Sequence, residues 1–524
     1  MKYIVITGGV ISGLGKGIVA SSIGLLLKQC GCSVTAVKID PYLNIDAGTM
    51  SPFEHGEVYV LEDGTETDLD LGNYERFLTI TMRKEHNITS GKVFQRVIND
   101  EREGKYIGQT VQFIPHVTNT IAAMIHEAAK IVVGETPPDV CIVELGGTIG
   151  DMESMHFVEA LRQMKDADPD NYCFVHVSPI LGGTEEEKTK PTQHSVQEIR
   201  RLGIQPDILV VRSHLPVLSE KAKAKLHLHC QVPLSRIHMN TDVEHIYQVP
   251  EFLYKQGIIT SVQQRLNMVD LVHPNDIFRY IPVGPKLKIA IVGKYIHENR
   301  DTYLSIHRAL EHAAFKQNSQ VCIVYLSSDT SNDLSLFDGV IIPGGFGSRG
   351  IEGMISTAKY CRKHNTPLLG ICLGMQIMCI EAARNRTGLS ACSSTEFNEH
   401  LNEQHRVVIA IEELEQTRLG GTMKLGAIPS KLIGKRILSI YEQSPCIQER
   451  HRHRYEINPA FRTSIEKDCL TVVGTDTQNH CIHVVEDCTR HFYIGCQFHP
   501  EYKSSLETPS PLFMAFVQTI LAII

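Results

Sequence analysis

The chain has 524 residues, 42% hydrophobic and 21% charged, with a formal net charge of −8 at pH 7. This length is too great for one hydrophobic core and predicts two large domains or several smaller ones. The negative charge argues against general nucleic-acid binding, because any polyanion site must then come from local basic patches. The 15 cysteines include no C-x-x-C pair, which argues against a zinc site or a disulfide framework and favours a reducing, cytoplasmic location.

Neither end of the chain predicts a membrane segment. The opening MKYIVITGG reads directly as a β-strand and leaves no room for a secretory signal. The closing LFMAFVQTILAII is apolar but shorter than the ~20 residues that span a bilayer. We therefore expect a final helix that packs on a core, with a membrane anchor as the alternative.

Short apolar runs recur through the first half, namely YIVITGG, SVTAVKID, VCIVELGG, YCFVHVSP and DILVVRS, with segments able to form helices between them. Buried strands that alternate with helices predict a parallel sheet and an α/β fold. The pattern restarts at Lys286 with KLKIAIVGKY, QVCIVYLSS, GVIIPGG and PLLGICLG. We expect two α/β domains, at 1–267 and 287–524, joined by a linker at 268–286.

A glycine-rich loop, GGVISGLGKG at 8–17, follows the first predicted strand. It departs twice from the phosphate-binding pattern G-x-x-x-x-G-K-[ST], with Val10 at the first glycine and Gly17 at the hydroxyl position. Backbone N–H groups and Lys16 are still suited to phosphate. A glycine-rich turn before a buried helix is the alternative.

Gly17 lacks the hydroxyl that usually ligates Mg²⁺, so other hard oxygen ligands are needed. Glu144 ends the apolar run VCIVE, where a parallel strand delivers its last side chain to the ligand-binding edge of the sheet. Asp70 lies in TETDLDLGNYERF, which a solvated surface loop would also explain. Both carboxylates are candidate metal ligands. The basic stretches KTKPTQHS at 188–195 and KAKAK at 221–225 suggest a second polyanion site or simply a solvated face.

In the second half, PLLGICLGMQ places Cys372 between Gly370 and Gly374, after an apolar strand and before a predicted helix. This arrangement is typical of a nucleophile elbow, in which the helix N-terminus favours the thiolate. A buried structural cysteine is the alternative.

A nucleophilic thiol needs a base and a group that orients the base. CQFHPE offers His499 and Glu501, which share one face if that stretch is extended. His499 can then move the proton while Glu501 fixes its tautomer. IIPGGFGSRG adds Gly344 and Gly345, whose N–H groups could form an oxyanion hole. The combination predicts attack on an amide carbonyl.

The stretches PGGFG, GICLGMQ and QFHPE resemble class I glutamine amidotransferase domains. The first half resembles the synthetase domain of CTP synthases over nearly its whole length. The stretches that carry this resemblance are GGVISGLGKG, KIDPYLNIDAGTMSPFEHGEVYV, DGTETDLDLGNYERF, VELGGTIGDMES and KTKPTQHSV, with STEF, LGGTMKLG and ERHRHRYE in the second half. The resemblance implies an N-terminal P-loop/Rossmann-like, dethiobiotin-synthetase-like domain followed by an α/β amidotransferase domain.

The resemblance also implies a reaction in which UTP, ATP and glutamine give CTP, ADP, phosphate and glutamate. ATP would phosphorylate O4 of the uracil, and ammonia freed at Cys372 would pass through the protein and displace the phosphate. It implies Mg²⁺ with ATP, activation by GTP, inhibition by CTP, and a homotetramer built as a dimer of dimers, with filaments as a further assembly. Neither a nucleic acid nor a membrane is an expected partner.

By position, the resemblance assigns residues to sites. The catalytic residues would be Cys372, His499 and Glu501. The ATP contacts would be Gly13, Leu14, Gly15, Lys16, Gly17, Ile18 and Asp70, with Lys38 as a further positive charge at the transferred phosphoryl. The UTP or CTP contacts would be Ser12, Asp151, Met152, Glu153, Lys188, Thr189, Lys190, Pro191, Thr192, Gln193 and Lys225. The glutamine contacts would be Gly345, Leu373, Gly374, Met375, Gln376, Glu396 and Arg454. Asp70 and Glu144 would hold the metal, and Arg349 would belong to a lid.

Two positions near the expected pyrimidine site depart from the family pattern. The stretch GGTEEEK, with glutamates at 185–187, is more acidic than usual, and His229 stands where phenylalanine is common. Another ATP-dependent amide-forming ligase with a fused glutaminase is the nearest alternative, although DPYLNIDAGTMSPFEHGEV is not expected there. A partitioning-type ATPase would not need Cys372 and His499, and a purely structural filament protein would not need the triad.

Overall fold

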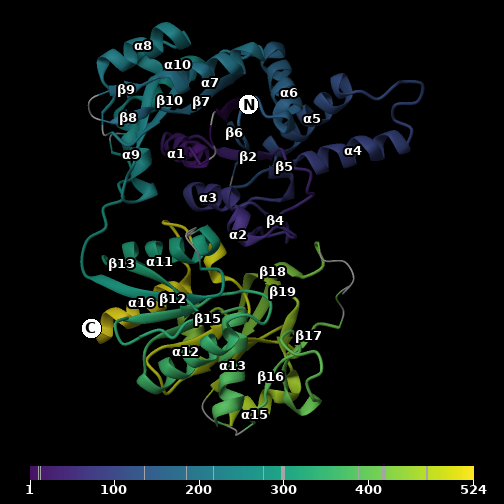
Figure 1. The fold of residues 1–524 in the computed structure, drawn as a ribbon, viewed down its shortest axis with the longest axis vertical. Helices are drawn as coiled ribbons and strands as arrows, with labels where there is room; N and C mark the ends of the chain where they lie inside the picture. The colour runs from purple at the N-terminus through teal and green to yellow at the C-terminus, as the bar shows by residue number, and fades with distance from the viewer. Residues whose placement is uncertain are drawn as a thin grey trace. The chain divides into compact units, whose positions relative to one another are not determined.

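The computed structural model describes residues 1–524 except 10, 12, 135, 184, 185, 216, 275, 297–300, 387, 388, 413, 415–419, 468 and 469. Ser12 and the acidic position 185 therefore lie outside the described residues. The chain forms two compact units (Figure 1), one of Met1–Ile45 and Asn73–Tyr280, the other of Asp46–Gly72 and Ile281–Ile524. Nothing in the sequence pattern indicated that residues 46–72 would group with the second half. The expected domain boundaries stay a prediction.

The first unit is built on a seven-stranded sheet in which every pairing is parallel. The strands, in order across the sheet, are β11 (Ile237–Thr241), β10 (Ile208–Ser213), β7 (Tyr172–Pro179), β1 (Lys2–Gly8), β6 (Val140–Leu145), β2 (Val34–Asp40) and β5 (Asn87–Thr89). All five apolar runs predicted as strands in the first half are among them. Almost every strand residue is buried, as expected when helices cover both faces of a parallel sheet.

Helices cover both faces of this sheet. α1 (Lys16–Gln29) contacts β1, β2 and β6 and packs on α9 (Val249–Lys255) and α10 (Ile258–Leu266). α5 (Thr118–Ala129) contacts β2 and β6 and packs on α4 (Ser90–Arg102) and α6 (Met155–Ala167). The remaining long helices, α7 (Lys190–Arg201) and α8 (Glu220–Cys230), contact each other. This arrangement confirms the predicted α/β fold of the first half.

The second unit contains a nine-stranded sheet that is parallel on one side and antiparallel on the other. The strands in order are β13 (Gln320–Ser327), β12 (Lys286–Gly293), β14 (Gly339–Ile342), β15 (Leu368–Ile371), β23 (Tyr493–Cys496), β22 (Ile482–Asp487), β21 (Leu470–Thr475), β18 (Lys424–Leu432) and β19 (Cys446–His453). The four predicted strands of the second half, β12 to β15, lie in the parallel part, which also includes β23.

Helices enclose this sheet as well. α12 (Ile351–His364) and α13 (Leu373–Arg386) pack together and contact the parallel strands. α11 (Leu304–Lys316) and α16 (Pro511–Ile523) pack on each other in a separate core cluster. α16 buries Leu512, Phe513, Phe516 and Val517, which confirms the predicted closing helix. In the part of the chain that the structure describes, no helix has both the length and the apolar character needed to cross a bilayer.

Smaller elements complete the second unit. The segment 46–72 contributes the short helix α2 (Pro52–His55), the strand pair β3 (Tyr59–Val60) and β4 (Glu66–Thr67), and the start of α3 (Leu69–Leu78). A three-stranded sheet is formed by β16 (Ser393–Ser394), β17 (Arg406–Ala410) and β20 (Tyr455–Ile457), and two short helices are α14 (Lys435–Ile440) and α15 (Arg462–Glu466).

Candidate active sites

The glycine loop of the first unit joins β1 to α1. Gly13 and Gly15 have φ values of 73° and 82°, which glycine adopts without strain. The Lys16 side chain lies against Gly8, where an added Cβ would come within 2.6 Å of Lys16 Cδ. Lys16 Nζ donates to the carbonyl of Gly147, 2.5 Å away. The loop therefore presents a lysine and the N-terminus of a 14-residue helix, both suited to an anion.

Beside the loop, a buried lysine lies between two carboxylates. Parallel pairing sets Lys38 opposite Glu144 at the carboxyl ends of their strands. Lys38 Nζ lies 3.2 Å from Glu144 Oε1 and 3.7 Å from Asp40 Oδ1, and Tyr74 donates to Glu144 Oε2. All four side chains are buried. Burial of a charged group is favourable only with such partners.

Asp70, the second expected metal ligand, lies in the first turn of α3 and belongs to the second unit. Among the residues that the structure describes, no group of three or more His, Cys, Asp or Glu side chains is arranged to hold a metal ion. The roles of Asp70 and Glu144 stay predictions.

The residues expected to contact the pyrimidine nucleotide differ in exposure. Lys188, Lys190 and Lys225 are exposed, as are Asp151, Met152 and Glu153. Thr192 is fully buried and its hydroxyl donates to Pro179 O at 2.7 Å, so this hydroxyl already has a structural partner. Gln193 Nε2 donates to Thr189 Oγ1 at 2.9 Å. Their nucleotide contacts stay predictions.

Sequence reasoning missed a buried histidine beneath the loop. His176 Nδ1 lies 2.9 Å from Thr7 Oγ1, and its Nε2 lies 2.6 Å from Ser195 Oγ. Burial, followed by the nearby Lys16 ammonium, lowers the pKa of His176 to about 3. A Cβ added at Gly9 would lie 1.9 Å from Ser195 Oγ. The neutral imidazole therefore links the start of the loop to helix α7, whose first residues are expected pyrimidine contacts. A histidine within an apolar run was the only signal in the sequence.

The second unit presents its thiol on a sharp turn between β15 and α13. Cys372 has φ 54°, a left-handed conformation rare for non-glycine residues. A Cβ added at Gly374 would lie 2.0 Å from Ile342 O, and one at Gly370 would lie 2.8 Å from the carbonyl carbon of Gly374. Both glycines are therefore required by close backbone approach. The predicted nucleophile elbow is present.

His499 and Glu501 form the expected pair, although the local structure differs from the prediction. His499 Nδ1 lies 2.7 Å from Glu501 Oε1. The prediction that these two residues lie on an extended stretch is wrong. β23 ends at Cys496, and a 3₁₀ turn, Pro500–Lys503, brings the two side chains together. Burial lowers the pKa of His499, but the Glu501 carboxylate and the Cys372 sulfur outweigh it and raise the pKa to about 10. The pair therefore favours the imidazolium form of His499.

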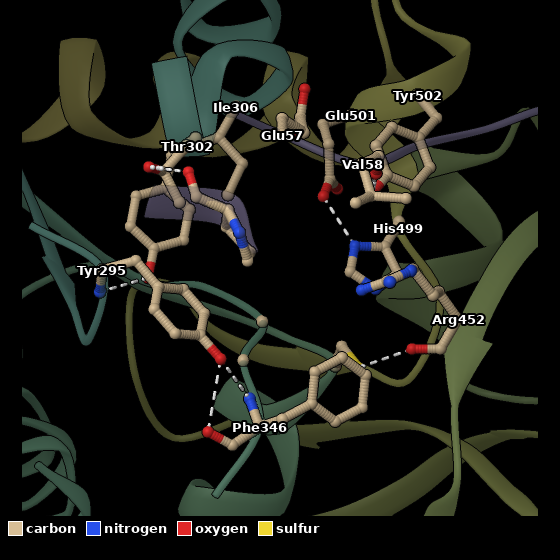
Figure 2. Close-up of a pocket in the computed structure, with 15 residues that line it drawn as sticks. Glu57, Val58, Tyr295, Thr302, Ile306, Phe346, Arg452, His499, Glu501 and Tyr502 are labelled. Carbon is tan, nitrogen blue, oxygen red and sulfur yellow. Dashed lines mark hydrogen bonds and ion pairs between the residues drawn. The ribbon is translucent and has the colours of Figure 1, made fainter. Parts of the chain in front are cut away.

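A cavity of about 70 Å³ lies over this thiol (Figure 2). It is lined by Pro52, Glu57, Val58, Tyr295, Thr302, Tyr303, Ile306, Gly344, Gly345, Phe346, Cys372, Arg452, His499, Glu501 and Tyr502. The predicted Gly344, Gly345, Cys372, His499 and Glu501 are thus brought together. Sequence reasoning gave no role to the aromatic wall or to Arg452, although Phe346 lies in PGGFG and Arg452 in ERHRHRYE, two stretches that carry the resemblance.

One wall of the cavity comes from the segment 46–72. Glu57 accepts hydrogen bonds from the backbone N and hydroxyl of Ser305, at 3.0 and 2.5 Å. The hydroxyl of Tyr59 donates to Tyr502 O at 2.7 Å. These buried bonds fix the segment beside His499 and Glu501 in the same unit.

The other expected glutamine contacts lie outside the cavity lining. Leu373 and Met375 are buried in the core. Gln376 Nε2 donates to Tyr455 O at 3.0 Å, Glu396 Oε1 accepts from Gly347 N at 2.6 Å, and Arg454 Nη2 donates to Thr422 Oγ1 at 2.9 Å. Their roles in binding glutamine stay predictions.

An elbow cysteine with a His–Glu pair, in a chain that also carries a phosphate-type loop on a parallel sheet, defines the class of glutamine amidotransferases fused to a synthetase. Comparison with known proteins agrees. The model of the class-I glutamine amidotransferase family matches residues 299–519, and the model of the CTP synthase N-terminus matches residues 2–268. The chain belongs to the CTP synthase family.

Similar proteins match this chain over nearly its full length. A CTP synthase of Sulfurisphaera tokodaii is 47% identical over 536 residues, covering 99% of each chain. One of Neurospora crassa is 43% identical over 556 residues, covering 99% of this chain and 95% of the relative. A solved glutaminase domain of a Trypanosoma brucei CTPS with bound acivicin is 32% identical, covers 45% of this chain and 94% of its own, and has a TM-score of 0.42.

Proposed function

We propose that the chain carries out the glutamine-dependent amination of UTP to CTP, with ATP as the phosphoryl donor. The observation that carries the proposal is the placement of Cys372 and the His499–Glu501 pair in one cavity that Pro52, Glu57 and Val58 also line. These three residues lie within 2–268, the range matched by the CTP synthase N-terminus. A thiol site suited to amide hydrolysis thus includes a wall from the synthetase part of the sequence.

In the glutaminase half, the Cys372 thiolate attacks the carboxamide carbon of glutamine and forms a thioester. The N–H groups of Gly345 and Leu373 stabilise the oxyanion, one from the loop and one from the residue after the nucleophile. His499 gives its proton to the leaving ammonia and then takes one from the water that hydrolyses the thioester, while Glu501 holds its tautomer. Glu396, Arg454 and Gln376 are proposed to hold the amino acid.

In the synthetase half, the glycine loop and Lys16 hold the ATP phosphates, and Lys38 offsets charge at the transferred phosphoryl. Mg²⁺ usually takes one or two carboxylates, with phosphate oxygens and water completing its shell. Glu144 and Asp70 are each proposed as such a ligand, because a carboxylate is the hard oxygen donor that Mg²⁺ prefers, and the ion would neutralise phosphate charge when bound. Phosphorylation of O4 makes a leaving group that ammonia displaces, giving CTP and phosphate.

The finer expectations belong to the same proposal. They are UTP or CTP contacts at 188–193, Lys225 and 151–153, inhibition by CTP, activation by GTP with Arg349 in a lid, a cytoplasmic location, and a homotetramer able to form filaments. The exposed Lys188, Lys190 and Lys225 support a triphosphate site, because charged donors in water-accessible positions can reach an arriving phosphate.

The test is a nucleotide-resolved assay with UTP, ATP and Mg²⁺, run in parallel with glutamine and with ammonia. Wild type should form CTP with both nitrogen sources. Cys372→Ala should lose the glutamine-driven reaction and keep the ammonia-driven one. Cys379→Ala, which changes a buried cysteine of the helix that follows Cys372, should keep both. Absence of CTP with either source in wild type would refute the proposal.

A further inference from the structure

A buried lysine holds the loop that carries the proposed oxyanion hole. Lys294 directly follows β12 and is 1% exposed. Its Nζ donates to the carbonyl of Phe346 at 3.0 Å and to that of Gly347. Its side chain also lies under the glycine pair, since a Cβ at Gly345 would be 3.2 Å from Lys294 Cδ. An ammonium group is thus bound to two successive carbonyls of one loop.

The neighbouring tyrosine binds the same loop (Figure 2). The hydroxyl of Tyr295 accepts from Phe346 N at 2.9 Å and donates to Phe346 O at 3.3 Å. Gly347 N donates to Glu396 Oε1 at 2.6 Å. All four backbone polar groups of Phe346 and Gly347 therefore have a partner, and the two peptide planes cannot turn without breaking these bonds.

Immediately before these residues, the glycine pair meets the reacting side chains. A Cβ added at Gly344 would lie 3.0 Å from His499 Cε1 and 3.6 Å from Cys372 Cβ. Glycine backbones rotate freely, so Gly344 and Gly345 cannot hold an N–H in place by themselves. An oxyanion hole depends on donors fixed before the charge develops. The required rigidity must come from outside the glycine pair.

We propose that Lys294, with Tyr295, is a positioning residue of the glutaminase reaction, which fixes the 344–347 loop so that its N–H donors meet the oxyanion formed at Cys372. This inference rests on the proposed glutaminase chemistry. Neither residue touches the reacting atoms in this role. Each acts through the loop backbone.

The surroundings of Lys294 make this role sensitive to pH. The pKa of Lys294 is lowered to about 8, chiefly by burial and also by the nearby Arg349, against the opposing effect of the Glu396 and Asp329 carboxylates. The ring of Phe397 lies 5.6 Å from Nζ, and the Tyr303 hydroxyl accepts from Lys294 N at 3.2 Å. A charged donor binds a carbonyl more strongly than a neutral amine. The hydrogen bonds from Lys294 Nζ to the loop carbonyls are therefore strongest below the pKa of Lys294 and weaken as pH rises through it.

The test compares Lys294→Met with Lys424→Met in the full chain. Lys424 is a matched control, a partly buried lysine of the same unit that pairs with Glu456 at 3.3 Å. In Lys294→Met, kcat for glutamine hydrolysis should fall ~10- to 100-fold, as expected for a misaligned oxyanion hole, with KM for glutamine little changed. Ammonia-driven CTP synthesis and alkylation of Cys372 by iodoacetamide should match wild type, because neither uses that hole. Lys424→Met should leave all four measurements near wild type.

A second pair of variants keeps the test decisive. Lys294→Arg retains the charge, so it should recover part of kcat and move the alkaline fall in hydrolysis above pH 8. Tyr295→Phe removes one hydroxyl and should lower kcat a few-fold, which remains measurable if Lys294→Met does not fold. Three outcomes would overturn the inference. They are a rise in KM alone in Lys294→Met, an equal loss of the ammonia-driven reaction in that variant, and an unchanged pH profile in Lys294→Arg. If wild type hydrolyses no glutamine, the proposed function itself fails, whereas a normal kcat in Lys294→Met refutes only the role of Lys294.

Discussion

Glu66 and Arg452 form a buried ion pair, with Oε1 and Nε 2.8 Å apart. The carbonyl of the same Arg452 accepts from Cys372 Sγ at 3.6 Å. Arg450, two residues earlier on β19, pairs with Glu62 at 2.9 Å. Two ion pairs therefore link β19, the strand beside the thiol, to the segment 46–72, which supplies a wall of the cavity.

Loss of this ion pair should uncouple the two half-reactions. Glu66→Gln keeps the shape but leaves the Arg452 charge buried without its carboxylate, which costs about 3 kcal/mol. With the cavity wall loosened, glutamate release should continue while less ammonia is converted to CTP. The measurement is the ratio of CTP formed to glutamate released, which should fall below that of wild type. Glu127→Gln, which removes an exposed pair with Arg96, should leave the ratio unchanged, and an unchanged ratio in Glu66→Gln would contradict this prediction.

Removal of the loop lysine should stop synthesis from either nitrogen source. Lys16→Ala deletes the only charged side chain of the 8–17 loop, so phosphoryl transfer loses its positioning and charge neutralisation. CTP formation with ammonia should fall at least ~100-fold, while glutamine hydrolysis remains measurable. Lys28→Ala, at the other end of the same helix, is the control. Full synthesis by Lys16→Ala would remove the loop from the mechanism.

The link between Thr7, His176 and Ser195 should matter for ATP binding. In His176→Asn, the shorter side chain can keep the contact to Thr7 but cannot reach Ser195, so helix α7 no longer supports Gly9. Loss of one buried hydrogen bond costs about 1 kcal/mol. Converted to a ratio at ~1.4 kcal/mol per factor of ten, this predicts that KM for ATP rises ~5-fold. Ser195→Ala should give the same rise.

His238→Asn is the matched control for His176→Asn, since His238 is also buried and bonds Ser261 Oγ of α10 at 2.9 Å, with no hydrogen bond to α7 among the described residues. It should leave KM for ATP unchanged. An equal rise in both variants would mean that the effect of His176 is general destabilisation.

The His499–Glu501 pair should make stability depend on pH. The folded-state pKa of His499 is raised to about 10, above the ~6.5 of an unfolded histidine, so the folded state binds the proton more tightly. Its contribution to the free energy of unfolding is complete below pH ~6.5 and is lost as pH rises toward 10. The difference in urea unfolding between wild type and His499→Gln should therefore shrink from pH 6 to pH 9. A difference that grows over this range would contradict the raised pKa.

Much of the fold follows from the sequence because its signals are local. Each apolar run predicted as a strand is a strand, and the C-terminal apolar stretch is a helix. The restart of the pattern at Lys286 marks the second sheet, whose first parallel strand begins there. The resemblance to CTP synthases, carried by contiguous motifs, is confirmed by the family models and by full-length relatives.

The sequence by itself determined the features that depend on residues close together in the chain. These are the glycine-flanked elbow of Cys372, the glycine loop with Lys16, and the nearness of His499 to Glu501. Only the tertiary structure decided that His499 and Glu501 meet through a 3₁₀ turn, that residues 46–72 group with the thiol, and that Lys294 holds the 344–347 loop. Glu66 and Arg452 are 386 residues apart, and no periodicity or motif connects them. Such pairs form because burial leaves each charge needing a partner, and which partner is near depends on how the strands and the segment pack.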